Sequence, residues 1–110
     1  MNNLTIKLIH TTDIHGCFFP FDFIEGRPCS GSMARISTYV ERMRSKYGNR
    51  LLLVDGGDIL QGQPTCYYCN FVQPQMKNVA ARVINFIRYD LQSIGNHDIE
   101  TGHAVYDKYA

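Results

Sequence analysis

The order of apolar and polar residues predicts three strands in this chain. Residues 4–10, LTIKLIH, alternate apolar side chains with Thr, Lys and His, as a half-buried strand does. Residues 50–58, RLLLVDGGD, contain an unbroken apolar run, which is typical of a strand buried on both faces. Residues 90–98, DLQSIGNHD, predict a third, short strand that ends in polar residues.

Two further segments repeat apolar residues every three or four positions, which is the spacing of an amphipathic helix. The first covers about 33–47, with Ser32 as its N-cap and YGN as its stop signal. The second is expected to start with Pro74 in its first turn. Its predicted buried side consists of Met76, Val79, Ala80, Val83, Ile84 and Ile87. A third helix is expected to start at about residue 101.

The predicted order β-α-β-α-β indicates an α/β fold class with a parallel sheet and right-handed crossovers. The connections 13–31 and 56–73 are expected to be irregular, and 13–31 alone holds three glycines and two prolines. A chain of 110 residues has the size of one small domain. One domain is therefore predicted, without linkers or internal repeats.

A polar cluster follows each predicted strand: DIH at 13–15, GGD at 56–58 and GNHD at 95–98. The carboxyl ends of parallel strands share one edge, where open α/β sheets bind their ligands. Taken alone, Asp13 reads as a turn former, Asp58 as a helix cap and the Asn-His pair as a left-handed turn. Three such coincidences at three aligned strand ends are harder to explain than one shared site.

The residue types at this edge suit divalent cations. Carboxylate, amide and imidazole groups come from Asp13, His15, Asp58, Asn96 and His97, and none of these is a thiolate. Such a mixed set of nitrogen and oxygen ligands favours Mn, Zn, Fe or Ni. Two divalent metal ions about 3.5–4 Å apart could hold a hydroxide and clamp a phosphate.

Other candidate residues have plainer interpretations. His10 is interpreted as structural and His103 as a surface or helix-start histidine. Cys66 and Cys69 have the spacing of zinc and redox motifs, but there is no second such pair, so reduced and partly buried thiols are expected.

Charge and hydropathy limit which partners and which cellular compartment are expected. The net charge is +1 and the basic residues are scattered, which argues against long nucleic acid and against a membrane surface as partners. The N-terminus lacks the pattern of a signal peptide, and no stretch approaches the roughly 20 apolar residues of a membrane span. The chain as written is therefore expected in the cytoplasm, or in the periplasm or outside the cell if a leader was removed.

The motifs DIHG, GGDILQG and GNHD, in this order and spacing, resemble the first three signature blocks of the calcineurin-like metallophosphoesterase superfamily. TTDIHG and GGDILQG are similar to its 5′-nucleotidase and 2′,3′-cyclic-nucleotide phosphodiesterase branch. The resemblance implies that Asp13 and His15 hold a first metal, that Asp58 bridges both metals and that Asn96 holds the second.

The same resemblance implies a reaction. Nucleotides or other small phosphate esters are the implied substrates, hydrolysed by a metal-activated hydroxide. His97 is expected over the phosphate, where it stabilises charge or protonates the leaving oxygen. Asp98 is expected to orient the ring of His97. The alternatives are another, nuclease-like member of the superfamily or a non-catalytic metal-binding fragment.

The family pattern continues with a further histidine ligand and a G-H-x-H block, and the branch adds a nucleoside-binding domain. His103 follows GNHD too closely to replace those ligands. Residues 1–110 are therefore expected to form the N-terminal part of the catalytic domain, the first half of an α/β/β/α sandwich, weakly active or inactive alone. Because this half contains one of the two sheets of the sandwich, the apolar face that would pack on the other sheet is uncovered. This uncovered face predicts self-association.

Overall fold

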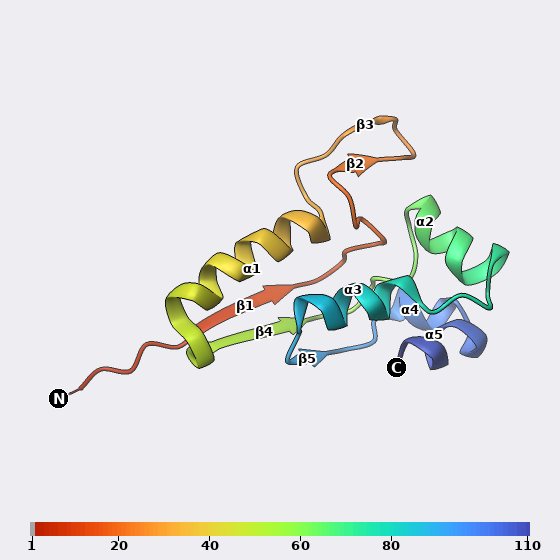
Figure 1. The fold of residues 1–110 in the computed structure, drawn as a ribbon. Helices are drawn as coiled ribbons and strands as arrows, with labels where there is room; N and C mark the ends of the chain where they lie inside the picture. The colour runs from red at the N-terminus through yellow and green to blue at the C-terminus, as the bar shows by residue number, and fades with distance from the viewer. Residues whose placement is uncertain (1) are drawn as a thin grey trace.

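A three-stranded parallel sheet organises the computed structural model, which describes residues 2–110. Its strands are β1 (Lys7–Thr11), β4 (Leu51–Asp55) and β5 (Leu91–Gln92). Their spatial order is β1-β4-β5, and both pairings are parallel (Figure 1). Thr11 pairs with Asp55, and Asp55 pairs with Gln92, so the three strands end in register. The predicted α/β class and the parallel pairing are confirmed.

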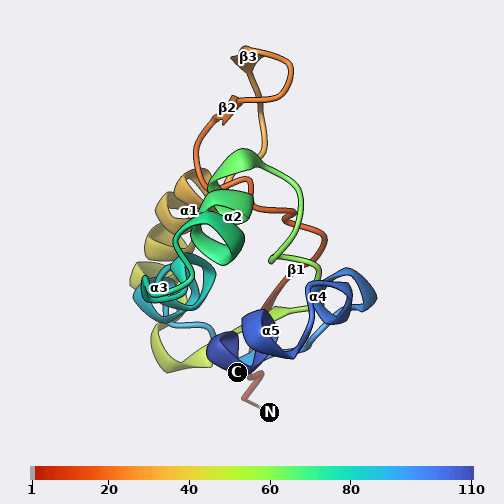
Figure 2. The ribbon, with the colours of Figure 1, turned by 90° about the vertical axis from the view of Figure 1, so that its right-hand side faces the viewer.

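The remaining elements are helices, short helical turns and one hairpin. The helices are α1 (Met33–Tyr47), α2 (Pro64–Tyr67), α3 (Val79–Ile87), α4 (Asn96–Glu100) and α5 (His103–Tyr109). A 3-10 turn covers Gly48–Arg50, and a π-helical turn covers Tyr68–Val72. The antiparallel hairpin consists of β2 (Phe21–Asp22) and β3 (Arg27–Pro28), and it extends away from the helices in both views (Figure 1, Figure 2).

Helix α1 has the predicted bounds and the predicted caps. The Ser32 side chain accepts a hydrogen bond from the backbone N–H of Arg35. At the other end Gly48 has φ +57°, a conformation that favours glycine, and its N–H donates to the Arg44 carbonyl. The Arg44 guanidinium also donates to the carbonyl of Arg88 at 2.6 Å, which joins the ends of α1 and α3.

Several predicted boundaries are wrong. The second helix, α3, begins at Val79 rather than near Pro74, because the Asn78 side chain accepts from the N–H of Ala81 and caps it there. The stretch 56–73 is not wholly irregular, since it contains α2 and the π-helical turn. The third strand ends at Gln92, and it is followed by a short helix that was not predicted, α4. The helix expected from about residue 101 is present as α5, which begins at His103.

The central strand β4 is covered on one face only. Leu51 and Leu53 are buried with Val40 of α1 and Ile84 of α3 in one core. On the opposite face Leu52 is 39% exposed, so the expectation of burial on both faces is wrong for this strand. The apolar open face also includes Leu8 of β1 and Leu91 of β5, both more than half exposed.

Candidate metal centre

The polar segments that follow the three strands meet at one edge of the sheet, as predicted. The N–H of Asp13 donates to the Gly57 carbonyl at 3.0 Å, and the N–H of His15 donates to the Asp58 carbonyl at 2.8 Å. The N–H of Ser93, just after β5, donates to the Asp55 carbonyl at 3.0 Å. These backbone bonds hold the segments after β1, β4 and β5 against one another.

Three of the predicted ligands form a compact cluster. Asp13, His15 and Asp58 each offer one ligand atom, and these atoms all lie within 4.8 Å of one another. The His15 Nε2 is 3.6 Å from the Asp13 Oδ1. Nitrogen and oxygen donors at such separations fit a divalent cation of borderline hardness, which would be held by these three side chains.

The backbone of this cluster is locally strained. Asp13, His15 and Asp58 have φ values of +56°, +48° and +61°, in the left-handed region. Among the other non-glycine residues that the structure describes, Arg88 alone shares this conformation. Strained backbone of this kind costs of order 1–3 kcal/mol per residue and gathers at ligand sites. The strain is therefore concentrated at the three residues whose side chains converge.

Two glycines allow the segments after β4 and β5 to touch. A Cβ on Gly57 would lie 2.4 Å from the backbone nitrogen of Gly95. A Cβ on Gly95 would lie 2.1 Å from the Oδ1 of Asp58. Neither approach is possible with a side chain present, so both positions need glycine for steric reasons.

Asp98 has a different place from the one expected. It is fully buried, and its carboxylate accepts four backbone hydrogen bonds of 2.7 to 2.9 Å. The donors are the N–H groups of Asp58, Ile59, Leu60 and Gly95. The expected contact with the His97 ring is absent among residues 2–110. Asp98 instead fixes the backbone on which Asp58 sits.

His97 lies beside the cluster. Its ring centroid is 5.5 Å from that of His15, in an edge-on arrangement. The backbone N–H of His97 donates to the Asp58 Oδ1 at 2.9 Å. Its Nδ1 is 2.8 Å from the Glu100 Oε2, so Glu100 orients the ring in place of Asp98. The hydrogen bond to Glu100 raises the pKa of His97, and the charges of Glu100, Asp58 and Asp13 act in the same direction.

Asn96 is the first residue of α4 and is exposed. Within residues 2–110 its side chain has no hydrogen-bond partner, so its oxygen is available to a ligand. The structure thus brings Asp13, His15, Asp58 and His97 together directly, and it places Asn96 next in the chain to His97.

Sequence reasoning missed two supporting residues. Asp55 is buried at the end of β4, where its Oδ1 accepts from the N–H of Gly57 and its Oδ2 from the Thr11 hydroxyl. Glu100 contacts His97 one helical turn away. The spacing of Glu100, three residues after His97 on a helix, is a signal that could have identified it. Asp55 follows an apolar run, which masked its role.

The other histidines and the C-x-x-C cysteines lie outside the cluster. His103 is largely exposed and contacts Tyr106 and Asp107 of its own helix. Cys66 is buried, and its thiol donates to the Ile59 carbonyl at 3.3 Å. Burial raises the pKa of the Cys66 thiol to about 12.

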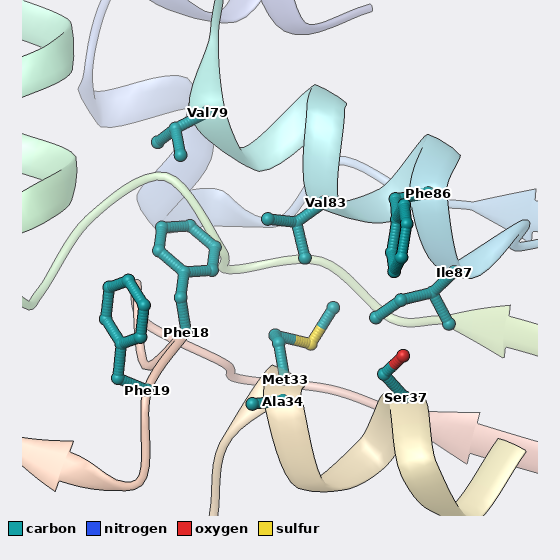
Figure 3. A pocket seen from close by; sticks show the side chains of 9 residues that line it. All are labelled: Phe18, Phe19, Met33, Ala34, Ser37, Val79, Val83, Phe86 and Ile87. Atoms are coloured by element: carbon teal, nitrogen blue, oxygen red, sulfur yellow. The ribbon is translucent and has the colours of Figure 1, made fainter.

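An apolar hollow lies between α1 and α3, with a volume of about 380 Å³. Its walls include Phe18, Met33, Val83 and Phe86, and no ionisable side chain lines it (Figure 3). Its one polar side chain is Ser37, and no carboxylate, imidazole or thiol lines it to hold a metal, so it is not the candidate metal centre.

Comparisons with known proteins agree with this geometry. The calcineurin-like phosphoesterase family matches residues 6–110, and the chain therefore belongs to that family. A 2′,3′-cyclic-nucleotide 2′-phosphodiesterase/3′-nucleotidase of Haemophilus influenzae is 26% identical over 92% of this chain and 16% of its own length. A snake venom 5′-nucleotidase of Crotalus adamanteus is 30% identical over 90% of this chain and 16% of its own length.

A solved structure shares the fold. The crystal structure of the calcineurin-like phosphoesterase YfkN from Bacillus subtilis superposes with a TM-score of 0.80 and 25% identity. The match covers 94% of this chain and 33% of that one. The chain thus spans a third or less of the length of these three proteins. In residues 2–110 no helix has the length and apolar character needed to cross a membrane.

Proposed function

We propose that this chain carries part of a two-metal site that hydrolyses phosphate mono- or diesters of nucleotides. The observation that supports it most is the convergence of Asp13, His15 and Asp58, with potential ligand atoms within 4.8 Å of one another, at the end of a parallel sheet. Membership of the phosphoesterase family and the nucleotidase names of the relatives support the reaction and the substrate class.

Each residue has a proposed role. Asp13 and His15 would hold one cation, Asp58 would contribute to both cations, and Asn96 would help to hold the second. When bound there, divalent ions would supply positive charge to the phosphate and lower the pKa of water. His97 stands at the side of the cluster, where its ring stabilises charge on the phosphate or gives a proton to the leaving oxygen.

Two residues position the others. Asp98 holds the backbone around Asp58 by accepting from the N–H groups of Asp58, Ile59, Leu60 and Gly95. Glu100 holds the ring of His97. The chain has four histidines, of which His15 is in the cluster and His97 lies beside it, and none belongs to a G-H-x-H block. Weak hydrolysis is therefore expected of this chain by itself, with metal binding as the stronger signal.

The experiment measures Mn²⁺ binding by calorimetry together with hydrolysis of a chromogenic phosphate monoester and a cyclic-nucleotide diester. The chain is compared with Asp58→Asn and with the control Asp107→Asn, whose side chain is 64% exposed and lies outside the cluster. Asp58→Asn should abolish both signals, and Asp107→Asn should keep both. Metal binding without any hydrolysis would favour a non-catalytic metal-binding module, and no metal binding at all would refute the proposed site.

A nuclease-like reaction is the second candidate. The near-neutral charge of the chain argues against it, because binding a long phosphate backbone needs a basic surface. Cleavage of DNA by this chain at a rate above that of the cyclic-nucleotide diester would reverse the order of the two candidates.

A further inference from the structure

Two cysteines face each other at the base of the β2–β3 hairpin. The sulfur atoms of Cys17 and Cys29 are 3.6 Å apart. Both thiols also lie close to one acceptor, the Gly31 carbonyl oxygen, at 3.1 Å from Cys17 and 3.2 Å from Cys29. The two side chains therefore point to the same place from the two ends of the hairpin.

The backbone around both residues can accommodate a covalent bond. A disulfide bond is about 2.0 Å long, so the sulfurs need to approach by about 1.6 Å from their present positions. Neither cysteine lies inside a helix or strand, so a small adjustment breaks no ladder. The Cys29 N–H already donates to the Pro20 carbonyl at 3.3 Å, which holds the two arms of the hairpin together.

The other two cysteines do not form such a pair. The Cys66 thiol is buried and donates to the Ile59 carbonyl. Cys17 and Cys29 are both partly exposed, so a small oxidant can reach them. The familiar C-x-x-C spacing thus marks the less suitable pair, and the better pair is separated by eleven residues of hairpin.

We propose that Cys17 and Cys29 form a redox pair that closes to an intramolecular disulfide and fixes the base of the hairpin. The oxidant is a low-molecular-weight disulfide such as oxidised glutathione. One cysteine thiolate attacks it, forms a mixed disulfide and releases one glutathione thiolate. The second cysteine loses its proton to solvent and attacks the protein sulfur, which forms the Cys17–Cys29 bond and releases the second glutathione. Two electrons pass from the protein to the oxidant.

The bond constrains a segment that has few other anchors. Among the side chains of the hairpin, Asp22 accepts from the Gln63 Nε2 at 3.0 Å, which ties the tip to the segment before α2. Phe21 and Phe23 contact each other at 5.1 Å between ring centroids, and both are substantially exposed. Closing a loop limits the open conformations that this segment can reach. Oxidation should therefore protect the hairpin from proteolysis at its phenylalanines.

Peptide mapping tests the proposal directly. The tryptic peptide 8–35 contains Cys17 and Cys29 and no other cysteine, because the bond between Arg27 and Pro28 resists trypsin. The chain is equilibrated with oxidised and reduced glutathione, its remaining thiols are alkylated, and the peptides are weighed without reduction. Peptide 8–35 should be two hydrogen atoms lighter and free of alkylation. Peptide 51–77, which carries both other cysteines, should be alkylated once the protein is unfolded.

A second measurement separates a specific bond from general oxidation. Chymotrypsin should cleave at Phe21 and Phe23 several-fold more slowly in the oxidised chain than in the reduced chain, whereas Cys29→Ser should show no difference between the two conditions. The matched control Cys69→Ser should behave as the unaltered chain does. Alkylation of both cysteines in peptide 8–35 under oxidising conditions, or disulfides formed mainly between chains, would overturn the proposal.

Discussion

The carboxylate of Asp98 accepts a hydrogen bond of 2.7 Å from the backbone N–H of Asp58, 40 positions earlier in the chain. It accepts three more from the N–H groups of Ile59, Leu60 and Gly95. One buried side chain thus joins the segment after β4 to the start of α4. The position of the proposed bridging ligand depends on a residue that was expected to serve another purpose.

Replacing Asp98 with Asn should destabilise the protein and loosen the cluster. The substitution replaces one carboxylate oxygen, which accepts two backbone hydrogen bonds, with an NH₂ group that cannot accept any. Two backbone N–H donors are left unpaired, and each buried unpaired donor costs about 1–3 kcal/mol. The free energy of unfolding, measured with urea, should fall by about 3 kcal/mol. Mn²⁺ affinity should fall about 10–100-fold, as for lost supporting contacts in metal sites. Asp107→Asn is the exposed control, and equal losses in the two variants would contradict this role.

Adding one methyl group at Gly95 should disrupt the candidate site. The backbone there has φ −86°, so alanine causes no conformational strain, but its Cβ would lie 2.1 Å from the Asp58 Oδ1. Asp58 must move, and Mn²⁺ binding measured by calorimetry should weaken at least about tenfold. Gly31→Ala is the matched control, because a Cβ there meets nothing within 4 Å. Unchanged binding in Gly95→Ala would show that Asp58 does not need its present position.

Neighbouring leucines of β4 should differ sharply in their contribution to stability. Leu53 is fully buried against the helices, and Leu53→Ala should lower the free energy of unfolding by about 2–5 kcal/mol. Leu52 points to the open face and is 39% exposed, so in the monomer, at protein concentrations too low for self-association, Leu52→Ala should cost less than about 1 kcal/mol. Urea unfolding of both variants measures the difference. Equal losses would mean that the open face is covered in solution.

Self-association through the open face is a further expectation. Leu8, Leu52 and Leu91 are exposed together on the sheet, and apolar patches of this kind promote association. Light scattering should detect species larger than a monomer, and Leu8→Lys should reduce them. Phe86→Lys is the control, since Phe86 is 79% exposed on α3, which packs on the other face. A monodisperse monomer of the unaltered chain would show the expectation to be wrong.

The convergence of the three polar segments could be predicted because parallel strands place their carboxyl ends at one edge, whatever the loops do. The role of Asp98 could not, since its four donors come from another part of the chain and only the folded backbone brings them within reach. The start of α3 was missed for a local reason. Pro74 suits a first turn, but Asn78 supplies a hydrogen-bonding cap that proline cannot provide.

The two ends of the hairpin, Cys17 and Cys29, lie side by side on the body of the protein. A segment with that geometry can gain or lose residues without moving Asp13 and His15 before it or α1 after it, because its two ends stay where they are. Insertions and deletions in the hairpin should therefore destabilise the protein less than changes elsewhere. During evolution the hairpin can gain new surface residues next to the proposed metal-binding edge of the sheet while that edge stays unchanged.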